Sequence, residues 1–452
     1  MNYTFKRTYL LSQQTPLIHF QYDQEGATLR ASEVKPKLDA YILKKKAKKG
    51  ETIPDDWFMR DKKGLNYRMT ISAKNVKIEP IGRGTRFDIY YGDKDKQGVL
   101  SDGIELKIVC RISKLLDCID LLIQDFFITH NFGTMQRKGF GSFLVTDVNG
   151  NAIPEPNAGR IAMLLCGEYS SMYCYKLQSD KNNTFKRIKA LYGLMKSGYN
   201  YGDICKKSLL FQFFHREDAN IPNEKHGIKS YRIAPKVYKP RNITEVYEIK
   251  HQYAFNNTIA FYYVRALLGL GDHIVFNGLS EDRVGKNPNE YCIVLSDGSV
   301  NKRTAYRDRL FEEDENDRPT NGIMVSITSV DSEIKRLKSP VFFKIINQTI
   351  YFVGEPINRE IIGKKFKFSS YWDDNIGRST KQRNVLRNVV SCNFTVPNEE
   401  QLQPFGGSKN LIDNFLDYVF NNYGSIQNII DPRENEKLLQ YSAKGVLMHE
   451  QP

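Results

Sequence analysis

The chain has 452 residues, of which 40% are hydrophobic and 26% are charged, a balance typical of folded globular proteins and unlike that of disordered chains. This length exceeds what one ordinary hydrophobic core serves, so we expect two domains. Lysine and arginine outnumber aspartate and glutamate by 66 to 52, a net charge of +14, which favours a polyanionic partner.

The cysteines and the N-terminal segment indicate the compartment. The seven cysteines are scattered, odd in number and never paired as CxxC, which argues against a zinc ribbon and against a disulfide framework. The opening segment, MNYTFKRTYLLSQQTPL, lacks the apolar block of a signal peptide. The longest apolar run is interrupted by Arg265, Asp272 and His273 and is too short to cross a bilayer. We therefore expect a cytoplasmic protein with no membrane partner.

The first half of the chain predicts the element order β-α-β-β-α-β. Residues 4–20 alternate as a strand, LRASEVKPKLDAYIL has helical spacing with Ser32 as its expected cap, and the lysine-dense residues 44–64 are expected to form a solvent loop. The segments NYRMTISAKNVKIEPI, TRFDIYYG and GIELKIVCRI predict strands. SKLLDCIDLLIQDFF predicts a second helix with Ser113 as its cap, and FGSFLVTDV predicts the closing strand.

The second half predicts the same arrangement in a less regular form. We expect a strand or paired strands in RIAMLLCGEYSSMYCYKL, a basic helix in TFKRIKALYGLMKSG, an apolar strand in SLLFQFFH and a helix in FNNTIAFYYVRALLGLG. KRLKSPVFFKIINQTIYFVG predicts two strands joined at NQ.

These patterns predict an α+β protein with two ferredoxin-like (RRM-like) β-α-β-β-α-β domains. Polar insertions are expected at 44–64, 216–250 and 300–322. The expected limits are 1–152 for an N-terminal domain with a glycine-rich loop, 153–400 for a second, heavily inserted domain, and 401–452 for a C-terminal helical segment.

Familiar catalytic motifs are missing from the sequence. It contains no GxxxxGK[ST] nucleotide loop, no GxSxG nucleophile turn and no HExxH zinc site. Seven histidines are spread along the chain without ligand spacing, so we predict no catalytic residue, no metal site and no cofactor. His130, just before a glycine-rich loop, is the histidine that we would test as a general acid or base.

The segment NFGTMQRKGFGSF, residues 131–143, is the most informative motif. Gly133, Gly139 and Gly141 permit positive φ and remove side chains that would keep a phosphate away from backbone N–H groups. Arg137 and Lys138 supply positive charge, and arginine offers two N–H groups to one phosphate. This composition favours sequence-independent contact with a nucleic-acid backbone. The structural alternative is a tight connection from helix to strand with solvated cations.

Other basic segments favour the same kind of partner. KKKAKKG, RIKALYGLMK and IGKKFKFSSYW each concentrate lysine or arginine, and the last interleaves them with aromatic residues that can stack on bases. Phe140 and Phe143 alternate along a strand and are expected in the core. Together with the net charge, these segments favour RNA or single-stranded nucleic acid over a small-molecule ligand.

Three segments resemble the RAMP superfamily, the RRM-like subunits of CRISPR effector complexes. TPLIHF and ATLRASEVKPKLDAYIL are similar to the opening strand, bend and first helix of that superfamily. FGTMQRKGFGSF is similar to its glycine-rich loop, most like that of the first Cmr subunit of type III-B complexes, and RLKSPVFFKII resembles a late strand of the same subunit. The long polar insertions and the lack of a tryptophan-rich first helix depart from the pattern.

The resemblance implies a structural subunit that binds RNA and is not an enzyme. Its implied partners are guide (CRISPR) RNA, target RNA and other RAMP subunits. Three glycines (Gly133, Gly139, Gly141) would shape the loop, and Arg137 and Lys138 would contact the RNA backbone.

Secondary contacts and two other functions stay open at this point. Arg30 and Lys35, at the start of the first helix, are expected to contact phosphate. The alternative is that both are solvated charges at the end of a helix. One alternative function is a metal-independent endoribonuclease of the same fold that depends on a histidine or tyrosine near the glycine-rich loop, with His130 the first candidate. The other is a basic protein-interaction module that does not bind RNA.

Overall fold

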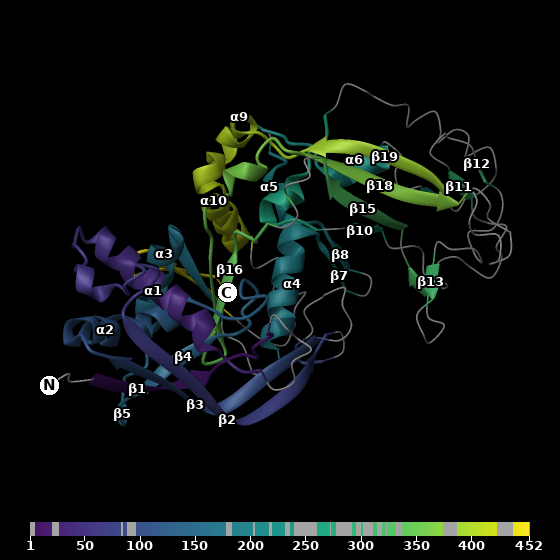
Figure 1. The fold of residues 1–452 in the computed structure, drawn as a ribbon. Coiled ribbons are helices and arrows are strands. Elements are labelled where there is room, and N and C mark those ends of the chain that lie inside the picture. Colours follow the sequence, from purple (N-terminus) through teal and green to yellow (C-terminus); the bar gives the residue numbers. More distant parts are fainter. Residues whose placement is uncertain are drawn as a thin grey trace. The chain divides into compact units, whose positions relative to one another are not determined.

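The structure is a computed structural model whose chain divides into two compact units (Figure 1). Unit 1 comprises Met1–Leu209, Pro340–Pro356 and Asn410–Pro452, and unit 2 comprises Leu210–Ser339 and Ile357–Lys409. Within these limits the structure describes residues 5–19, 27–82, 85–87, 96–177, 183–201, 204–216, 219–230, 236–238, 260–271, 273–276, 292–294, 300–301, 311–313, 319–321, 323–330, 334, 337–373, 387–422 and 437–451.

The N-terminal part of unit 1 has the element order that the sequence predicts. Strand β1 lies in the centre of the sheet β2-β3-β1-β4-β5, in which all neighbouring strands are antiparallel. This is the strand order of a ferredoxin-like sheet. The elements are β1 (Phe5–Gln13), α1 (Ala31–Lys48), the 3-10 turn η1 (Asp55–Trp57), β2 (Tyr67–Ile81), β3 (Lys96–Cys110), α2 (Ser113–Thr129), β4 (Phe143–Val148) and β5 (Asn151–Ala152).

One face of this first sheet is apolar because buried apolar and exposed polar side chains alternate along its strands. On β2, Tyr67 and Met69 are buried, while Arg68 between them is exposed. Helices α1 and α2 contribute buried apolar residues at helical spacing to the same cluster, so the helices and the sheet share one core. At its rim, Arg7 Nε on β1 lies 2.7 Å from Asp120 Oδ2 on α2, which ties helix to sheet.

The lysine run that we expected in a solvent loop continues α1 instead. Residues 44–48, four of them lysines, form the last turns of the helix. Lysine has a good helix propensity, and its charge is favoured at the C-terminal end, where the helix dipole is negative. The expected caps are also wrong, because α1 is capped at Arg30 rather than Ser32, and α2 at Ile112 rather than Ser113.

A second sheet in unit 1 repeats the connectivity of the first. Its order is β16-β17-β6-β20-β21, again with antiparallel neighbours, and β6 holds the place that β1 holds in the first sheet. In chain order, β6, α4, β16, β17, α10 and β20 give β-α-β-β-α-β. The bounds in unit 1 are α3 (Ala158–Tyr169), β6 (Tyr173–Leu177), α4 (Thr184–Lys196), β7 (Tyr199–Tyr201), β8 (Ile204–Lys206), β16 (Phe342–Ile346), β17 (Thr349–Val353), α10 (Gly407–Asn421), β20 (Leu438–Ser442) and β21 (Leu447–Gln451).

The second sheet is assembled from three separated runs of the chain. Unit 2 occupies the two stretches between them, Leu210–Ser339 and Ile357–Lys409. The segment 401–452, expected to be helical, contains α10 but also the strands β20 and β21.

The α+β class and the antiparallel sheets that the sequence predicts are confirmed by the helices and sheets of unit 1.

Two apolar runs that we expected as strands are helical in whole or in part, and the end of the first run forms the expected strand, β6. Helix α3 takes most of RIAMLLCGEYSSMYCYKL and begins after Asn157, whose side chain accepts a hydrogen bond from Arg160 N at 2.8 Å. SLLFQFFH contains the helix α5 (Leu209–Phe213). A short apolar run by itself does not distinguish a buried helix from a strand.

Other expectations for the second half fare differently. Helix α4 and the hairpin β16–β17 are confirmed, and Asn347 and Gln348 form its turn with φ of 46° and 64°. In FNNTIAFYYVRALLGLG, the described residues contain a 3-10 helix, η2 (Val264–Leu268), in place of the expected helix. We expected a strand in TRFDIYYG, but residues 85–87 form a turn, and the rest of that segment lies outside the described residues. Most of the insertions 216–250 and 300–322 also lies outside the described residues.

Unit 2 is built around a separate antiparallel sheet, β10-β15-β18-β19. Its interior includes a buried ion pair between Glu224 and Arg265. In the described parts of the chain, no helix is long and apolar enough to cross a membrane, and no group of His, Cys, Asp and Glu is arranged to hold a metal ion. The bounds are α6 (Glu224–Ser230), β9 (Lys236–Tyr238), β10 (His273–Phe276), β11 (Cys292–Val294), β12 (Val300–Asn301), β13 (Phe311–Glu313), β14 (Pro319–Asn321), β15 (Ile323–Ser329), η4 (Arg359–Ile361), β18 (Lys365–Asp373), β19 (Arg387–Thr395), α9 (Glu399–Leu402) and η6 (Gln403–Phe405).

Candidate nucleic-acid interface

The glycine-rich loop, residues 131–142, connects α2 to β4. All three glycines singled out in the sequence have a positive φ, between 66° and 87°. A Cβ on Gly141 would lie 1.9 Å from Phe132 O, and a Cβ on Gly133 would lie 2.4 Å from Ile18 O. The glycines therefore let the loop pack closely against its own chain.

A carboxylate of the same chain faces the backbone of the loop. The Gly133 N–H donates to Glu33 Oε1 on α1 at 2.8 Å. Glu33 also pairs with Lys37 at 2.9 Å, and Lys37 Nζ donates to Asn131 O and to Gln136 Oε1, both at 3.2 Å. One polar network thus joins the first turns of α1 to the loop. The sequence signal for Lys37 was its position four residues after Glu33, where the two charges meet on one helix face.

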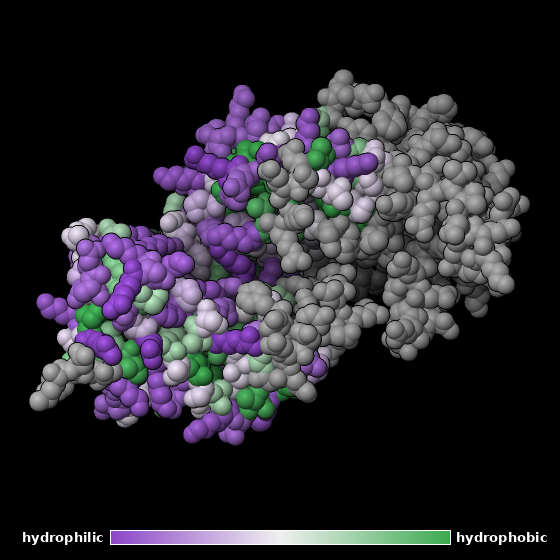
Figure 2. Space-filling view, viewed as in Figure 1, coloured by the Kyte–Doolittle hydropathy of each residue, from purple (hydrophilic) through white to green (hydrophobic). Residues whose placement is uncertain are grey.

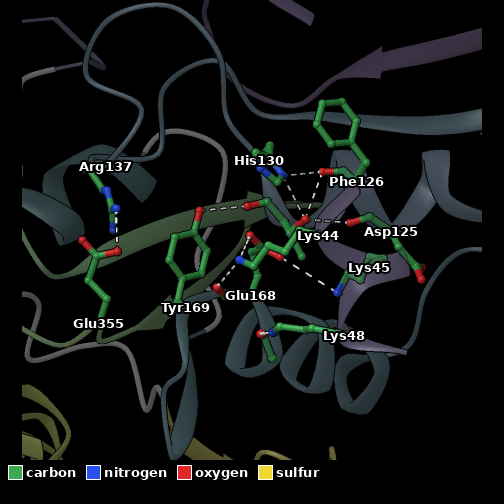
Figure 3. A network of polar contacts seen from close by, with 12 residues as sticks. Lys44, Lys45, Lys48, Asp125, Phe126, His130, Arg137, Glu168, Tyr169 and Glu355 are labelled. Carbon is green, nitrogen blue, oxygen red and sulfur yellow. Dashed lines mark hydrogen bonds and ion pairs between the residues drawn. The ribbon is translucent and has the colours of Figure 1, made fainter. Parts of the chain in front are cut away.

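Arg137 is engaged within the chain. Its Nη2 lies 2.8 Å from Glu355 Oε2 (Figure 3). Its guanidinium lies 5.2 Å and 5.6 Å from the ring centroids of Tyr169 and Phe342. The side chains of Arg137 and Glu355 are 19% and 15% exposed. The phosphate contact expected of Arg137 stays a prediction, and a phosphate would have to compete with Glu355 for the guanidinium.

Lys138 directs its ammonium group into the protein. Its Nζ lies over the ring of Tyr192 on α4 and has no hydrogen-bond acceptor among the described residues. Burial, with a smaller effect from the Lys196 charge, lowers the pKa of Lys138 well below its ordinary value of 10.5. The RNA contact expected of Lys138 also stays a prediction, and it requires the side chain to leave this position.

The loop extends the second sheet beyond β16. Lys138 forms a parallel bridge with Phe343, whose N–H donates to Arg137 O at 3.1 Å. Gly139 lies so close to Ile345 that a Cβ would be 2.8 Å from the Ile345 side chain. The loop therefore covers the β16 edge, whose backbone groups would otherwise be open to pairing with another strand.

Lys344 on β16 is a further cation at the loop that our reading of the sequence missed. It is fully buried and donates to Phe127 O at 2.7 Å, to His130 O at 2.8 Å and to Asn131 Oδ1 at 3.1 Å. These acceptors lie at the C-terminal end of α2, where the helix dipole favours a cation. Burial lowers the pKa of Lys344 well below 10.5. The available signal was a lysine in the centre of the apolar strand FFKII.

His130 has the environment of a packing residue. Its Nδ1 lies 3.1 Å from Phe126 O and 3.0 Å from Thr129 Oγ1, and its ring lies 4.7 Å from the Phe126 ring. Burial is the main cause that lowers the pKa of His130 to about 3. The imidazole is therefore neutral at physiological pH, so it is not the imidazolium that a general acid requires.

The structure separates the two secondary candidates. Arg30 is exposed at the N-terminal cap of α1, three residues before Glu33, which accepts from the loop. Lys35 instead reaches Asp39 Oδ2 at 2.8 Å and Leu65 O at 2.9 Å. Lys35 is thus engaged on the side of Asp39 and Leu65, and the phosphate contacts expected of Arg30 and Lys35 both stay predictions.

The lysine run of α1 meets the C-terminal end of α3 (Figure 3). Lys44 Nζ lies 2.6 Å from Glu168 Oε1, and Lys48 Nζ donates to Gly167 O at 3.0 Å. Cations are favoured at this end of a helix by its dipole. Part of the charge that the sequence offered to RNA therefore holds two helices together.

The aromatic residues interleaved with cations are buried. Phe366 and Phe368 on β18 are 2% and 0% exposed, while the lysines between and before them are exposed. Phe140 and Phe143 are also fully buried, which confirms the core position that we expected. These four rings are therefore not placed to stack on bases.

Hydrophilic side chains dominate the visible surface around α1 (Figure 2). The exposed cations of this helix and its ends are Arg30, Lys44, Lys48 and Lys49. A surface of this composition suits contacts to a phosphate backbone, which carry no sequence preference.

Two family models match the chain. The Cmr1 N-terminal domain matches residues 4–199, and the Cmr1 C-terminal domain matches residues 205–440. No curated protein matches it.

Two solved structures align with parts of the chain. The crystal structure of Cmr1 from Pyrococcus furiosus (apo form) is 10% identical, with 41% of this chain and 70% of that chain covered and a TM-score of 0.27. A chain of the cryo-EM structure of the type III-B Cmr-beta bound to cognate target RNA is 13% identical, with 32% of this chain covered and a TM-score of 0.24. The match spans 60% of that chain's length. Likeness at these scores carries no argument, and the domain models carry the assignment.

The models also confirm the predicted resemblance to the RAMP superfamily and to its first Cmr subunit. Because the models of the N-terminal and C-terminal Cmr1 domains match residues 4–199 and 205–440, the chain belongs to the Cmr1 family.

Proposed function

We propose that the chain is an RNA-binding structural subunit of a type III-B CRISPR RNA-guided effector complex. Membership of the Cmr1 family is the observation that carries this proposal. The net charge of +14 supports it, because neutralising phosphates is the main source of affinity for nucleic acid. The proposed partners are guide (CRISPR) RNA, target RNA and other RAMP subunits, in the cytoplasm.

The two β-α-β-β-α-β sheets of unit 1 are proposed as the two RAMP domains. The first follows the expected limits 1–152. We extend the second beyond the expected 153–400 to residue 451, because α10 and β20 complete its connectivity. Unit 2 is then an insertion within the second domain.

We place the RNA contact on the outer side of the glycine-rich loop and the first turn of α1. Arg30 is exposed there, and Gln136 of the loop is half-buried. In this proposal the three glycines set the shape of the loop. Arg137 and Lys138 would add contacts on release from Glu355 and from Tyr192.

The nuclease alternative needs a proton donor other than His130, whose burial keeps the imidazole neutral. The protein-interaction alternative predicts that the isolated chain does not bind RNA. One binding experiment therefore separates all three functions.

The test measures binding of a labelled single-stranded RNA of roughly 40 nucleotides, long enough for several sites of about 4–16 nucleotides. Wild type is compared with Arg30→Glu at two salt concentrations, and the RNA is checked on a gel afterwards. Lys114→Glu is the matched control, because Lys114 is exposed at the opposite end of α2 from the loop and the charge change is the same. We expect Arg30→Glu to weaken binding about tenfold and to lower the salt slope by about 1 or more, with Lys114→Glu near wild type.

The outcomes are distinct. An equal loss in both variants would place the contact elsewhere on the basic surface. Cut RNA would favour the nuclease. A wild-type chain that binds no RNA at low salt would contradict the proposal. Arg137→Glu with Lys138→Glu is a poorer first test, because both side chains are packed inside unit 1 and their loss would disturb the fold.

A further inference from the structure

Two carboxylates of the chain occupy hydrogen-bond donors of the glycine-rich loop. Glu355 Oε2 lies 2.8 Å from Arg137 Nη2 (Figure 3). Glu33 Oε1 accepts from the Gly133 N–H, also at 2.8 Å. Guanidinium groups and the backbone N–H groups of glycine loops are donors by which proteins hold phosphate, and a carboxylate is an anionic acceptor as phosphate is. The loop therefore already holds two anions that belong to its own chain.

Glu355 leaves part of the guanidinium without a partner. Its carboxylate contacts Arg137 at Nη2, whereas Nη1 is buried and has no hydrogen-bond partner among the described residues. Arginine binds carboxylates and phosphates best through two parallel N–H bonds, and a buried donor without an acceptor is destabilising. A phosphate that accepts from both nitrogens therefore has an advantage over the carboxylate that the free chain offers.

Two further side-chain groups of the loop are buried without a hydrogen-bond partner in the described part of the chain. They are the hydroxyl of Thr134 and the ammonium group of Lys138. Both can donate to a phosphate oxygen, as Arg137 Nη1 can. Buried polar groups in folded proteins are nearly always paired, so three unpaired donors within five residues indicate a loop that an anionic ligand satisfies better than its own chain does.

Of the two cations, Arg137 is the one that a ligand reaches first. Its side chain is 19% exposed, whereas Lys138 Nζ is buried over the Tyr192 ring. A partly exposed ion pair is weakened by water and salt, so exchanging Glu355 for a phosphate costs one modest contact. Release of Lys138 requires a fully buried group to move, and it would follow rather than lead.

We infer that Glu355 and Glu33 are built-in competitors of RNA, which occupy donors of the glycine-rich loop until phosphates displace them, with Arg137 the first cation released. This inference rests on the proposed function and gives the regulation of the same site. The two carboxylates lower the affinity of the free chain for polyanions in general. An RNA that makes further contacts on the surrounding surface supplies the free energy that displaces them.

The test measures affinity for the labelled single-stranded RNA at two salt concentrations. Glu355→Gln removes the charge and keeps an oxygen that accepts from Arg137. Asp120→Asn is the matched control, because Asp120 also pairs with an arginine, Arg7, at 2.7 Å, and lies about 14 Å along α2 from the end where the loop begins. We expect Glu355→Gln to bind about fivefold more tightly than wild type, with a salt slope steeper by about 0.9, and the control to change affinity less than about twofold.

Arg137→Gln tests whether the gain depends on the guanidinium. It should weaken RNA binding about fivefold in the Glu355→Gln background and less than about twofold in wild type, because in wild type the guanidinium gives up Glu355 to reach the phosphate. Equal losses in the two backgrounds would overturn the inference, since they would mean that Glu355 does not compete with RNA.

Glu33→Gln is an independent second variant, which keeps the test decisive if Glu355→Gln does not fold. It should raise RNA affinity about twofold, because an amide oxygen accepts from the Gly133 N–H more weakly than a carboxylate does. Circular dichroism and the unfolding temperature check that each variant keeps the wild-type fold. A folded Glu33→Gln variant with wild-type affinity would remove Glu33 from the inference.

Failure of the inference is separable from failure of the proposed function. If wild type binds RNA and Glu355→Gln gains no more affinity than Asp120→Asn, the competition is overturned and the RNA-binding function stands. If wild type binds no RNA at low salt, the proposed function is contradicted and the inference falls with it.

Discussion

The two sheets of unit 1 share a connectivity but differ in how the chain supplies their strands. The first sheet takes its strands from one run, residues 5–152, whereas the second takes them from residues 173–177, 342–353 and 438–451. Closing the long connections of the second sheet costs conformational entropy. The glycine-rich loop and Lys344 join β16 to the first fold. Two sheets with the same topology therefore need not be equally stable on their own, and we infer that the stability of the second sheet depends on the first.

The largest effect should come from adding a side chain at the loop. Gly141→Ala places a Cβ 1.9 Å from Phe132 O, so we expect unit 1 to lose about 4 kcal/mol or more of unfolding free energy. Gly150→Ala is the matched control, since Gly150 also has a positive φ but no atom within 4 Å of the added Cβ. It should cost about 1 kcal/mol. Denaturant unfolding of both variants measures the difference, and equal losses would show that backbone conformation alone matters.

The next effect concerns the buried cation of the second sheet. Lys344→Met leaves the carbonyls at the end of α2 without a donor, and we expect a loss of about 2–4 kcal/mol. Lys107→Met, at a half-buried lysine of the first sheet, should cost less than about 1 kcal/mol. Hydrogen exchange should speed up in β16 and β17 before it does in β1 and β3. Faster exchange in the first sheet would reverse the dependence that we infer.

A smaller effect is expected for the ion pair that fastens the loop. A double-mutant cycle with Arg137→Gln and Glu355→Gln should give a coupling of about 1 kcal/mol, because both side chains are largely shielded from water. The pair Arg160 and Asp125, with Arg160 41% exposed, is the comparison, and its coupling should be weaker. A larger coupling in the exposed pair would contradict a fastening role for Arg137.

The smallest effect is a change in how stability depends on pH. The pKa of Lys138 is lowered in the folded chain, so the unfolded chain binds more protons between that lowered pKa and 10.5. Stability should therefore rise with pH across this window, and Lys138→Met should remove part of the rise. Lys344, whose pKa is lowered in the same direction, supplies a remaining part. An identical pH dependence in wild type and variant would mean that the ammonium of Lys138 is solvated.

The sequence predicts the first fold better than the second for a physical reason. Alternation such as Tyr67–Arg68–Met69 and the helical spacing of α2 are local, and they stay readable when the partners are nearby in the chain. Strand β6 finds its partners β17 and β20 across long stretches, so no local pattern reveals the sheet. The sequence of α3 shows no clear helical period, because its exposed side also carries an apolar residue, Met163.

The sequence predicted the backbone conformation of the glycine-rich loop, but it did not predict the partners of the charged side chains in that loop. The positive φ of the three loop glycines follows from their type and crowding. The burial of Lys138 depends on Tyr192, and the engagement of Arg137 on Glu355, and both partners come from distant segments. Lys35 is engaged by Asp39 and Leu65, and Leu65 comes from a segment that the spacing of the first helix does not reveal.

The interrupted second sheet has a consequence for the nascent chain. Strand β6 ends at Leu177, and its neighbour β17 begins at Thr349, so a ribosome that adds about 5–20 residues per second needs roughly 10–35 seconds to deliver it. During that time β6 has both edges unpaired in a growing polypeptide. Its other neighbour, β20, begins at Leu438 and emerges later still. Closure of this sheet is therefore timed by protein synthesis, and slower translation would prolong the interval in which chaperones must protect it.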